Sequence, residues 1–216
     1  MKNEEMKKNR NRLLLFVVSS LLMLVACSKD DTVSVTEPTA TGMFTDVRDG
    51  NVYSFVTIDG LDWLVENFRF DLGDRDKCCV YQNEDDFKLQ IYSTENLPKF
   101  GMLYTLSGAQ EAVPEGWRLP TDADWTALEQ NGGYLSAAFG LVYGGYFTKN
   151  TVNAAANGSR FKGAWAYFWS STKDEGKNGI FYFARKKFYN EQTMERLSME
   201  PEAYFLSLRL VREKLK

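Results

Sequence analysis

The sequence contains no histidine among its 216 residues. This absence removes the usual catalytic base, the histidine-dependent serine and cysteine nucleophiles, and the commonest side-chain ligand of transition metals. Cysteine is limited to Cys27, Cys78 and Cys79, which leaves little material for a zinc site built from thiolates. We therefore expect a protein without catalytic residues, without a bound metal and without a cofactor.

An excess of basic residues is also missing. The chain has 26 lysine and arginine residues against 29 aspartate and glutamate residues, a formal net charge of −3. Residues 1–26 hold more bases than acids, so the remainder of the chain is more acidic still. A protein that binds a phosphate backbone needs a basic footprint. The composition therefore argues against nucleic acid as a partner.

The N-terminus combines a basic segment with a short apolar run. The apolar run covers residues 13–26 with two serines inside it, and the basic residues before it are Lys2, Lys7, Lys8, Arg10 and Arg12. A transmembrane helix needs about 20 predominantly apolar residues, so this run is short for a single span that happens to precede a cysteine. The pattern is typical of an export signal. We predict a signal peptide over residues 1–26.

The end of this run, Leu24-Val25-Ala26-Cys27, resembles the lipobox of bacterial lipoproteins. The resemblance implies that Cys27 receives a diacylglycerol, that the chain is cut just before it, and that the new amine is acylated, for example with palmitate. Several acyl chains give a stable anchor, since each buried methylene contributes roughly 0.8 kcal/mol. We expect Cys27 to be lipidated and the protein to be anchored in the outer membrane.

The residues after Cys27 refine this location. Ser28-Lys29-Asp30-Asp31 resembles the surface export signal of Bacteroidetes lipoproteins, which implies exposure on the cell surface. The alternative is a charged segment that only keeps the linker solvated. Residues 27–42 lack a sustained period and are rich in threonine, serine and aspartate, so we predict a flexible tether. Asp31-Thr32-Val33 also resembles the O-glycosylation sequon of the same bacteria.

Cys78 and Cys79 are adjacent in an exported chain, where disulfides can form. Neighbouring Cα atoms are about 3.8 Å apart, which is below the usual disulfide range. A strained vicinal disulfide and a pair of thiols in a loop are both open, and we favour the thiols. The surrounding residues 71–100 are acidic but lack EF-hand spacing, so we interpret them as a solvated insertion and not as a calcium loop.

Secondary-structure signals predict an α+β fold in the remainder of the chain. Alternating residues on both sides of Asp59-Gly60 predict a β-hairpin. Thr121 and Asp124 form a capping-box pattern for a helix with Trp125 turned inward, and residues 131–133 supply its stop. Short aromatic segments in the C-terminal third predict an antiparallel sheet. The last strand, residues 205–211, is expected to have one apolar and one mixed face.

A family resemblance rests on motifs that follow one another between Phe44 and Glu213: FTDVRDGNVYSFVTIDGLDWLVENF, GMLYT, PEGWRLPTDADWTAL, GGYF, FWSSTK and LSLRLVRE. This order resembles the Fibrobacter succinogenes major paralogous domain. The resemblance implies that residues 43–216 form a C-type-lectin-like fold with mostly antiparallel short strands, one or two helices and long loops. The GWRLPT..DW block also resembles formylglycine-generating enzymes, which share that fold.

The chain departs from these relatives at positions that matter for chemistry. Val113 and Leu210 stand where the family commonly has cysteines, as if a packed pair had replaced a disulfide, and Arg118 stands where a histidine is frequent. Trp169-Ser170-Ser171 lacks the oxygen ligands that calcium-dependent lectins carry there. No cysteine follows Cys79, although formylglycine formation uses a cysteine pair near the end of the domain. We expect the fold to be shared and neither chemistry to be present.

Aromatic residues supply the remaining functional signal. Trp63, Trp117, Trp125 and Trp169 lie in the recurring motifs, and we interpret them as core residues. Trp165 follows a polar loop and is the better candidate for stacking on a ligand. The ligand-binding candidates are Asn150, Asn153, Asn157, Arg160, Trp165 and Tyr167. An exposed loop without a ligand is the alternative.

Together these features predict a surface-anchored, non-catalytic recognition or adhesion lipoprotein. Its ligand would be a glycan, which makes carbohydrate binding one expected activity, or a protein. The alternative is a structural or assembly subunit of a cell-surface complex. An enzyme is a third hypothesis, because Asp122 and Asp124 could do acid/base work. Helix capping explains the same carboxylates more simply, so we expect no enzymatic activity.

Overall fold

The computed structural model describes residues 34–81, 95–149 and 158–214, which belong to a compact unit that begins at Ser34. Its strands are β1 (Ala40–Thr45), β2 (Val52–Ile58), β3 (Leu61–Leu64), β4 (Cys78–Val80), β5 (Met102–Tyr104), β6 (Tyr146–Thr148), β7 (Gly158–Arg160), β8 (Trp165–Asp174), β9 (Phe181–Phe188), β10 (Glu195–Met199), β11 (Tyr204–Ser207) and β12 (Val211–Glu213). Its helices are α2 (Asn96–Phe100), α3 (Leu106–Ala112) and α4 (Asp122–Gln130), with 3-10 turns η1 (Gly133–Leu135), η2 (Ala137–Phe139) and η4 (Glu175–Lys177).

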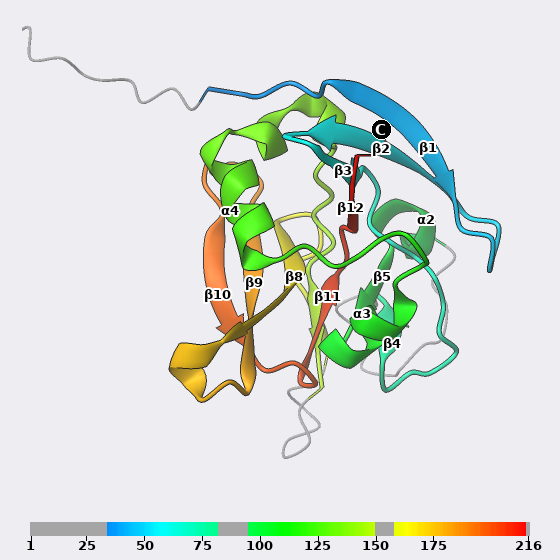
Figure 1. Ribbon diagram of the computed structural model, residues 1–216. Helices are drawn as coiled ribbons and strands as arrows, with labels where there is room; N and C mark the ends of the chain where they lie inside the picture. The colour runs from blue at the N-terminus through cyan, green and yellow to red at the C-terminus, as the bar shows by residue number, and fades with distance from the viewer. Residues whose placement is uncertain (1–33, 82–94, 150–157, 215–216) are drawn as a thin grey trace, which may run out of the picture. The chain divides into compact units, whose positions relative to one another are not determined.

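The strands form two sheets. The first has the order β1-β2-β3-β12, and the second has the order β10-β9-β8-β11-β5-β4, with β6 and β7 attached beside β11 (Figure 1). The β8–β11 pair is parallel, and the other pairings between these strands are antiparallel. This arrangement confirms the predicted α+β class with mostly antiparallel strands. No helix among the described residues is long and apolar enough to cross a membrane.

The predicted hairpin is confirmed. β2 and β3 pair in antiparallel register with Ile58 opposite Leu61. Asp59 and Gly60 form the turn between them with φ values of 51° and 82°. A two-residue turn of type I′ requires a positive φ at both positions, and the Asp-Gly pair tolerates it.

Helix α4 begins and ends where the sequence predicts. The Thr121 backbone N–H donates to the Asp124 carboxylate over 2.7 Å, and the Asp124 N–H donates to the Thr121 hydroxyl over 3.1 Å. This reciprocal pair satisfies two N–H groups that the first helical turn leaves without partners. Trp125 is fully buried against Trp63 and Phe168, with ring centroids 5.0 and 5.4 Å away. The inward orientation of the helix's tryptophan is therefore confirmed.

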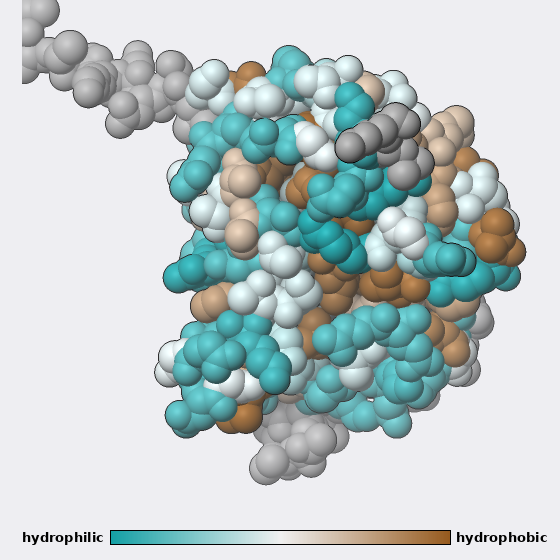
Figure 2. Space-filling model, in the orientation of Figure 1, coloured by the Kyte–Doolittle hydropathy of each residue, from teal (hydrophilic) through white to brown (hydrophobic). Residues whose placement is uncertain are grey.

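A buried arginine joins α4 to the second sheet. Arg185 of β9 donates to the carboxylates of Asp122 and Glu129 and to the Thr126 hydroxyl. The helix lies beside β8 and β9 as a result (Figure 1). Figure 2, in the orientation of Figure 1, shows hydrophobic residues gathered near the centre of the visible face, with hydrophilic residues around them.

The N-terminal edge of the unit is attached before the predicted domain start at Met43. Thr36 donates its backbone N–H to Asn131 over 3.0 Å, and Thr39 donates to Thr57 over 2.9 Å. β1 then begins at Ala40. Residues 36–42, which the sequence analysis included in the tether, are thus hydrogen-bonded to the domain.

Cys78 and Cys79 lie in a strand, so the expectation of a loop within a solvated insertion was wrong for them. They belong to β4, which pairs with β5 and is buried throughout. Successive strand residues face opposite sides, and the two thiols accordingly enter two different hydrophobic clusters. Both are free thiols. Burial raises the pKa of the Cys78 thiol to about 11 and raises that of Cys79 as well.

The predicted last strand is divided between the two sheets, so the prediction of a single strand over residues 205–211 was wrong. β11 ends at Ser207 in the second sheet, and β12 begins at Val211 in the first. Residues 204 and 212 are half-buried, whereas every residue from Phe205 to Val211 is buried. The expected mixed face is therefore covered on both sides, because the segment passes through the interior between the sheets.

Arg209 occupies the middle of this crossing segment and is buried. Its guanidinium donates to the Asn67 side chain over 2.9 Å and to the Leu64, Phe139 and Gly140 carbonyls over 2.9, 3.1 and 2.6 Å. Burial lowers its pKa to about 9, which still leaves it protonated at neutral pH. Its hydrogen-bond partners are neutral groups, and they connect β3, the segment after it and the end of η2.

Replacing this guanidinium should destabilise the whole unit. Arg209→Met leaves several buried acceptors without donors, each of which costs about 1–3 kcal/mol. We expect the free energy of unfolding to fall by about 3 kcal/mol or more, as measured by urea denaturation. The matched control is Arg196→Met, at an exposed ion pair, where the change should stay within about 1 kcal/mol. Equal effects of the two substitutions would contradict the role given to Arg209.

The two buried thiols should be unreactive in the native state. Thiolate is the nucleophile, and burial disfavours it. In a Cys27→Ser variant, we expect an aromatic disulfide reagent to modify neither Cys78 nor Cys79 at neutral pH until denaturant is added, after which both react. Rapid modification of the folded protein would show that β4 is not closed as described.

Candidate functional site

The structure places three of the six predicted binding residues. Arg160 ends β7, and Trp165 and Tyr167 lie on β8. Asn150, Asn153 and Asn157 lie outside the described residues. The Trp165 and Tyr167 rings are neighbours, with centroids 6.4 Å apart. The other four tryptophans are buried, which confirms their interpretation as core residues.

Trp165 and Tyr167 belong to a row of aromatic rings that sequence reasoning recognised only in part. We call this row the aromatic patch, and its members are Tyr146, Phe161, Trp165, Tyr167, Phe188, Tyr189 and Tyr204. Successive ring centroids are 4.8 Å apart for Tyr189–Phe188, 4.5 Å for Phe188–Trp165, 5.0 Å for Tyr167–Tyr146, 5.9 Å for Tyr146–Phe161 and 5.8 Å for Tyr146–Tyr204. Such distances are those of interacting aromatic pairs.

Strand register builds the patch. Trp165, Tyr167 and Trp169 alternate along β8 and share one face. Trp169, at the inner end, is buried and donates its indole N–H to Tyr104 over 2.7 Å. Trp165, at the outer end, lies opposite Phe188 of β9 and is only partly buried. The face therefore passes from core to surface along one strand.

The patch is exposed at its two ends and carries cations near its middle. Phe161 is 45% exposed and Tyr189 is 58% exposed. The Lys186 ammonium lies 4.6 Å from the Trp165 ring centroid and also pairs with Glu195. Burial raises the pKa of Tyr146, and the nearby charge of Arg160 opposes this shift. Arg160 of β7 lies opposite Tyr146 of β6, so this member of the predicted set is close to the patch.

A pocket of about 260 Å³ adjoins the patch. We call it the tyrosine pocket, and its lining residues are Tyr134, Leu135, Ser136, Ala137, Gly140, Leu141, Tyr143, Lys187, Tyr189 and Glu191. Tyr189 belongs both to this pocket and to the aromatic patch. The two features are therefore continuous at the end of β9.

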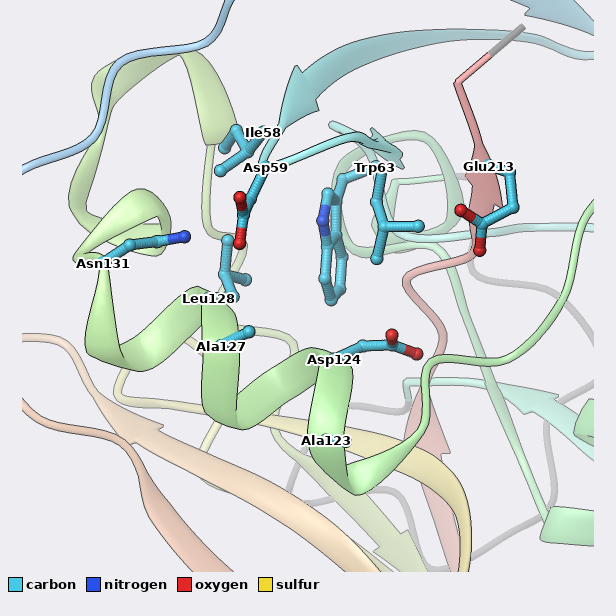
Figure 3. Close-up of a pocket in the computed structure, with 10 residues that line it drawn as sticks. Ile58, Asp59, Trp63, Ala123, Asp124, Ala127, Leu128, Asn131 and Glu213 are labelled. Carbon is cyan, nitrogen blue, oxygen red and sulfur yellow. The ribbon is translucent and has the colours of Figure 1, made fainter.

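A separate groove of about 300 Å³ lies between the β2–β3 hairpin and α4 (Figure 3). Trp63 and Leu128 form its apolar part, with Asp59 and Asn131 toward one end and Asp124 toward the other (Figure 3). The remaining lining residues are Ile58, Leu61, Ala123, Ala127 and Glu213.

Two of the carboxylates that line this groove, those of Asp124 and Glu213, are already engaged. Arg118 donates to Asp124 over 2.6 Å and to Glu213 over 3.1 Å. Burial alone would raise the pKa of Asp124, but hydrogen bonds from Arg118 and Thr121 lower it below its ordinary value. Asp122 is paired with Arg185 and Arg196. A carboxylate held ionised is a poor general acid, so the capping interpretation accounts for Asp124. Among the described residues, no group of three potential metal ligands lies together.

Residues 56–137 match the family model described as the Fibrobacter succinogenes major domain. The match covers less than half of the chain, and the similarity to this family is shown over these residues. This confirms the resemblance over these residues, whereas the later motifs up to Glu213 lie beyond the match. Comparisons with curated proteins and with solved structures find no match.

The Fibrobacter succinogenes major domain, as matched, contains the groove but not the aromatic patch. Apart from Glu213, every residue that lines the groove lies within residues 56–137. Every member of the patch follows residue 137 in the chain. The patch is thus built by the part of the chain that the family match does not cover.

The ion pair of Asp124 should make stability depend on pH. Because the folded-state pKa of Asp124 is lowered, its ionised form stabilises the fold above the unfolded pKa of about 3.9. This contribution is lost as the pH falls through the folded pKa. We expect Asp124→Asn to be less stable than the wild type at pH 7, with the difference shrinking below about pH 4.

Chemical denaturation at several pH values measures this dependence. Asp59→Asn is the matched control, because Asp59 is exposed in the hairpin turn. The control should retain the wild-type profile. A difference between Asp124→Asn and the wild type that stays constant down to pH 2 would exclude the ionised carboxylate as its source.

Proposed function

We propose that this protein is a non-catalytic recognition or adhesion lipoprotein that binds glycan or protein through the aromatic patch. The observation that carries the proposal is the continuous row of rings from Tyr189 through Trp165 to Phe161, which is exposed at both ends. Aromatic faces stack on apolar faces of ligands, and tyrosine and tryptophan add a polar group at the ring edge. This chemistry suits sugar rings and extended peptides alike.

The geometry of the patch favours binding at low entropic cost. Each ring contacts at least one neighbouring ring, and most of them also lie on strands, as for Trp165 between Phe188 and Tyr167. Rings that are already ordered lose little rotamer freedom when a ligand binds. Large rigid side chains of this kind are frequent hot spots of recognition.

The proposal includes a location and a fold. A signal peptide over residues 1–26, a lipid on Cys27 and a tether that follows it would attach the domain to the outer membrane, facing outward. Residues 1–33 lie outside the described residues, so this part rests on the sequence motifs. We extend the proposal to a C-type-lectin-like fold, for which the family domain and the short antiparallel strands are the support.

The proposal assigns no catalytic role. Histidine is absent from the sequence, and the carboxylates that could serve as acid and base are tied into ion pairs. Asp122 is bound by Arg185 and Arg196, and Asp124 caps α4. These uses support a binding module better than a hydrolase.

A second candidate function is a structural or assembly subunit of a cell-surface complex. β1 is an edge strand of the first sheet, with Met43 on it 71% exposed and Val47 just after it 92% exposed. An exposed edge strand can accept a further strand from a partner protein. This candidate predicts a stable protein partner and no binding to free glycan.

Glycan-array binding of the full chain tests the leading proposal. We expect Tyr189→Ala and Phe161→Ala each to weaken binding by roughly 5-fold, since a stacked aromatic contact contributes about 1 kcal/mol. Both side chains are exposed, so truncation should leave the thermal unfolding midpoint nearly unchanged. Trp165→Ala should weaken binding further.

The matched control is Val47→Ala, at an exposed apolar side chain in the turn after β1, which should not alter glycan binding. Loss of binding in Val47→Ala with retention in the patch variants would reverse the assignment. A folded protein that binds no glycan but retains a partner from the native envelope would favour the structural subunit.

A further inference from the structure

Lys187 is a buried lysine that lies at the boundary between the core and the tyrosine pocket. Lys187 is 2% exposed, and it is one of the residues that line the pocket. Its ammonium donates to the carbonyl oxygens of Phe188, over 2.7 Å, and Glu191. Two backbone carbonyls therefore hold the Lys187 ammonium in place of the water that would otherwise solvate it.

The charge of Lys187 is not matched by a carboxylate partner in the part of the chain that the structure describes. Among the described residues, none of the ion pairs includes it, although Lys186 beside it pairs with Glu195. Burial lowers the pKa of Lys187, and the charge of Glu191, which also lines the pocket, opposes this shift. A buried cation is costly unless it is paired. An ammonium also has three donors, and two carbonyls account for two of them.

The walls of the pocket suit one ring with hydroxyl groups. Tyr134, Tyr143 and Tyr189 line it together with apolar side chains such as Leu141. Tyr134 uses its hydroxyl on the Gln192 carbonyl, which fixes that ring. The volume of about 260 Å³ is below the range of about 300–1,000 Å³ that is usual for small-molecule sites, as expected for a single residue of a longer ligand.

Continuity with the aromatic patch indicates what that longer ligand is. Tyr189 lines the pocket and lies 4.8 Å from Phe188, whose ring lies 4.5 Å from Trp165. Phe188 and Lys187 are adjacent on β9 and face opposite sides of the sheet. A ligand made of several linked rings, stacked on the aromatic patch, can therefore turn around the end of β9 and reach Lys187.

We propose that the tyrosine pocket binds a carboxylate-bearing sugar residue, of the uronic acid class, within a glycan whose neighbouring residues stack on the aromatic patch. The Lys187 ammonium supplies the third hydrogen bond and the counter-charge for the carboxylate. This inference rests on the proposed function of the patch. It adds a charge requirement, which stacking alone does not impose.

Matched ligands test the charge requirement directly. The probes are oligosaccharides of galacturonate, glucuronate and mannuronate, each compared with its carboxyl-reduced, neutral counterpart. We expect the full-length wild-type protein to bind at least one acidic form roughly 10-fold or more tightly than its reduced counterpart, because a charge-assisted hydrogen bond contributes about 1.5–3 kcal/mol. Isothermal titration calorimetry measures both affinities.

Two lysine variants locate the effect. Lys187→Met keeps the length and apolar stem but removes the charge, and it should abolish the preference for the acidic form while binding of the neutral form persists. Lys173→Met, at an exposed lysine of β8 outside the pocket and the patch, should retain the preference. A preference that survives Lys187→Met, or that Lys173→Met removes as fully as Lys187→Met does, would overturn the assignment to the pocket.

The wild-type comparison needs no variant, so it decides the matter even if Lys187→Met fails to fold. Equal binding of acidic and neutral forms would overturn this inference and leave the proposed function of the patch intact. Absence of binding to any glycan, with the protein folded, would overturn both.

Discussion

One buried guanidinium connects the parts of this molecule on which the candidate site depends. Arg209 lies in the segment that leaves the second sheet and enters the first, and it donates to groups from β3, from the segment after β3 and from the end of η2. It also lies 5.4 and 5.7 Å from the ring centroids of Phe139 and Phe168. Phe168 is on β8, between Tyr167 and Trp169, so the interior face of the patch-bearing strand packs around this cation. The opposite face of β8 carries Trp165, Tyr167 and Trp169, so the packed interior supports the rings of the aromatic patch on this strand.

Local sequence signals predicted the elements that local interactions determine. The Asp59-Gly60 turn and the Thr121–Asp124 capping box each depend on residues within a few positions of one another. Cys78 and Cys79 form a strand by pairing with β5, more than twenty residues later in the chain. The acidic residues around them favoured the prediction of a loop instead. The division of the last strand had the same cause, because an alternating pattern cannot show that Leu208 to Leu210 pass between two sheets.

The candidate site also has a part that local sequence signals predicted and a part that they did not. Trp165 and Tyr167 could be singled out because they follow a polar loop, whereas Phe188, Tyr146 and Tyr204 join them only through strand register. The signal in the sequence was the aromatic content of each C-terminal segment, and the pairing that aligns those segments is not local. The buried ammonium of Lys187 could not be predicted, since an isolated lysine on a strand is ordinarily solvated.

Nuclear magnetic resonance of the five tryptophan indole N–H groups offers the most direct test of the central claim, that recognition occurs at the aromatic patch. During titration with a bound glycan, the account predicts that the Trp165 indole signal shifts, whereas those of the buried Trp125 and Trp169, which donate to backbone carbonyls, stay in place. A shift of the Trp63 signal at the groove with no change at Trp165 would contradict the account and transfer the binding site to the family-matched part of the chain.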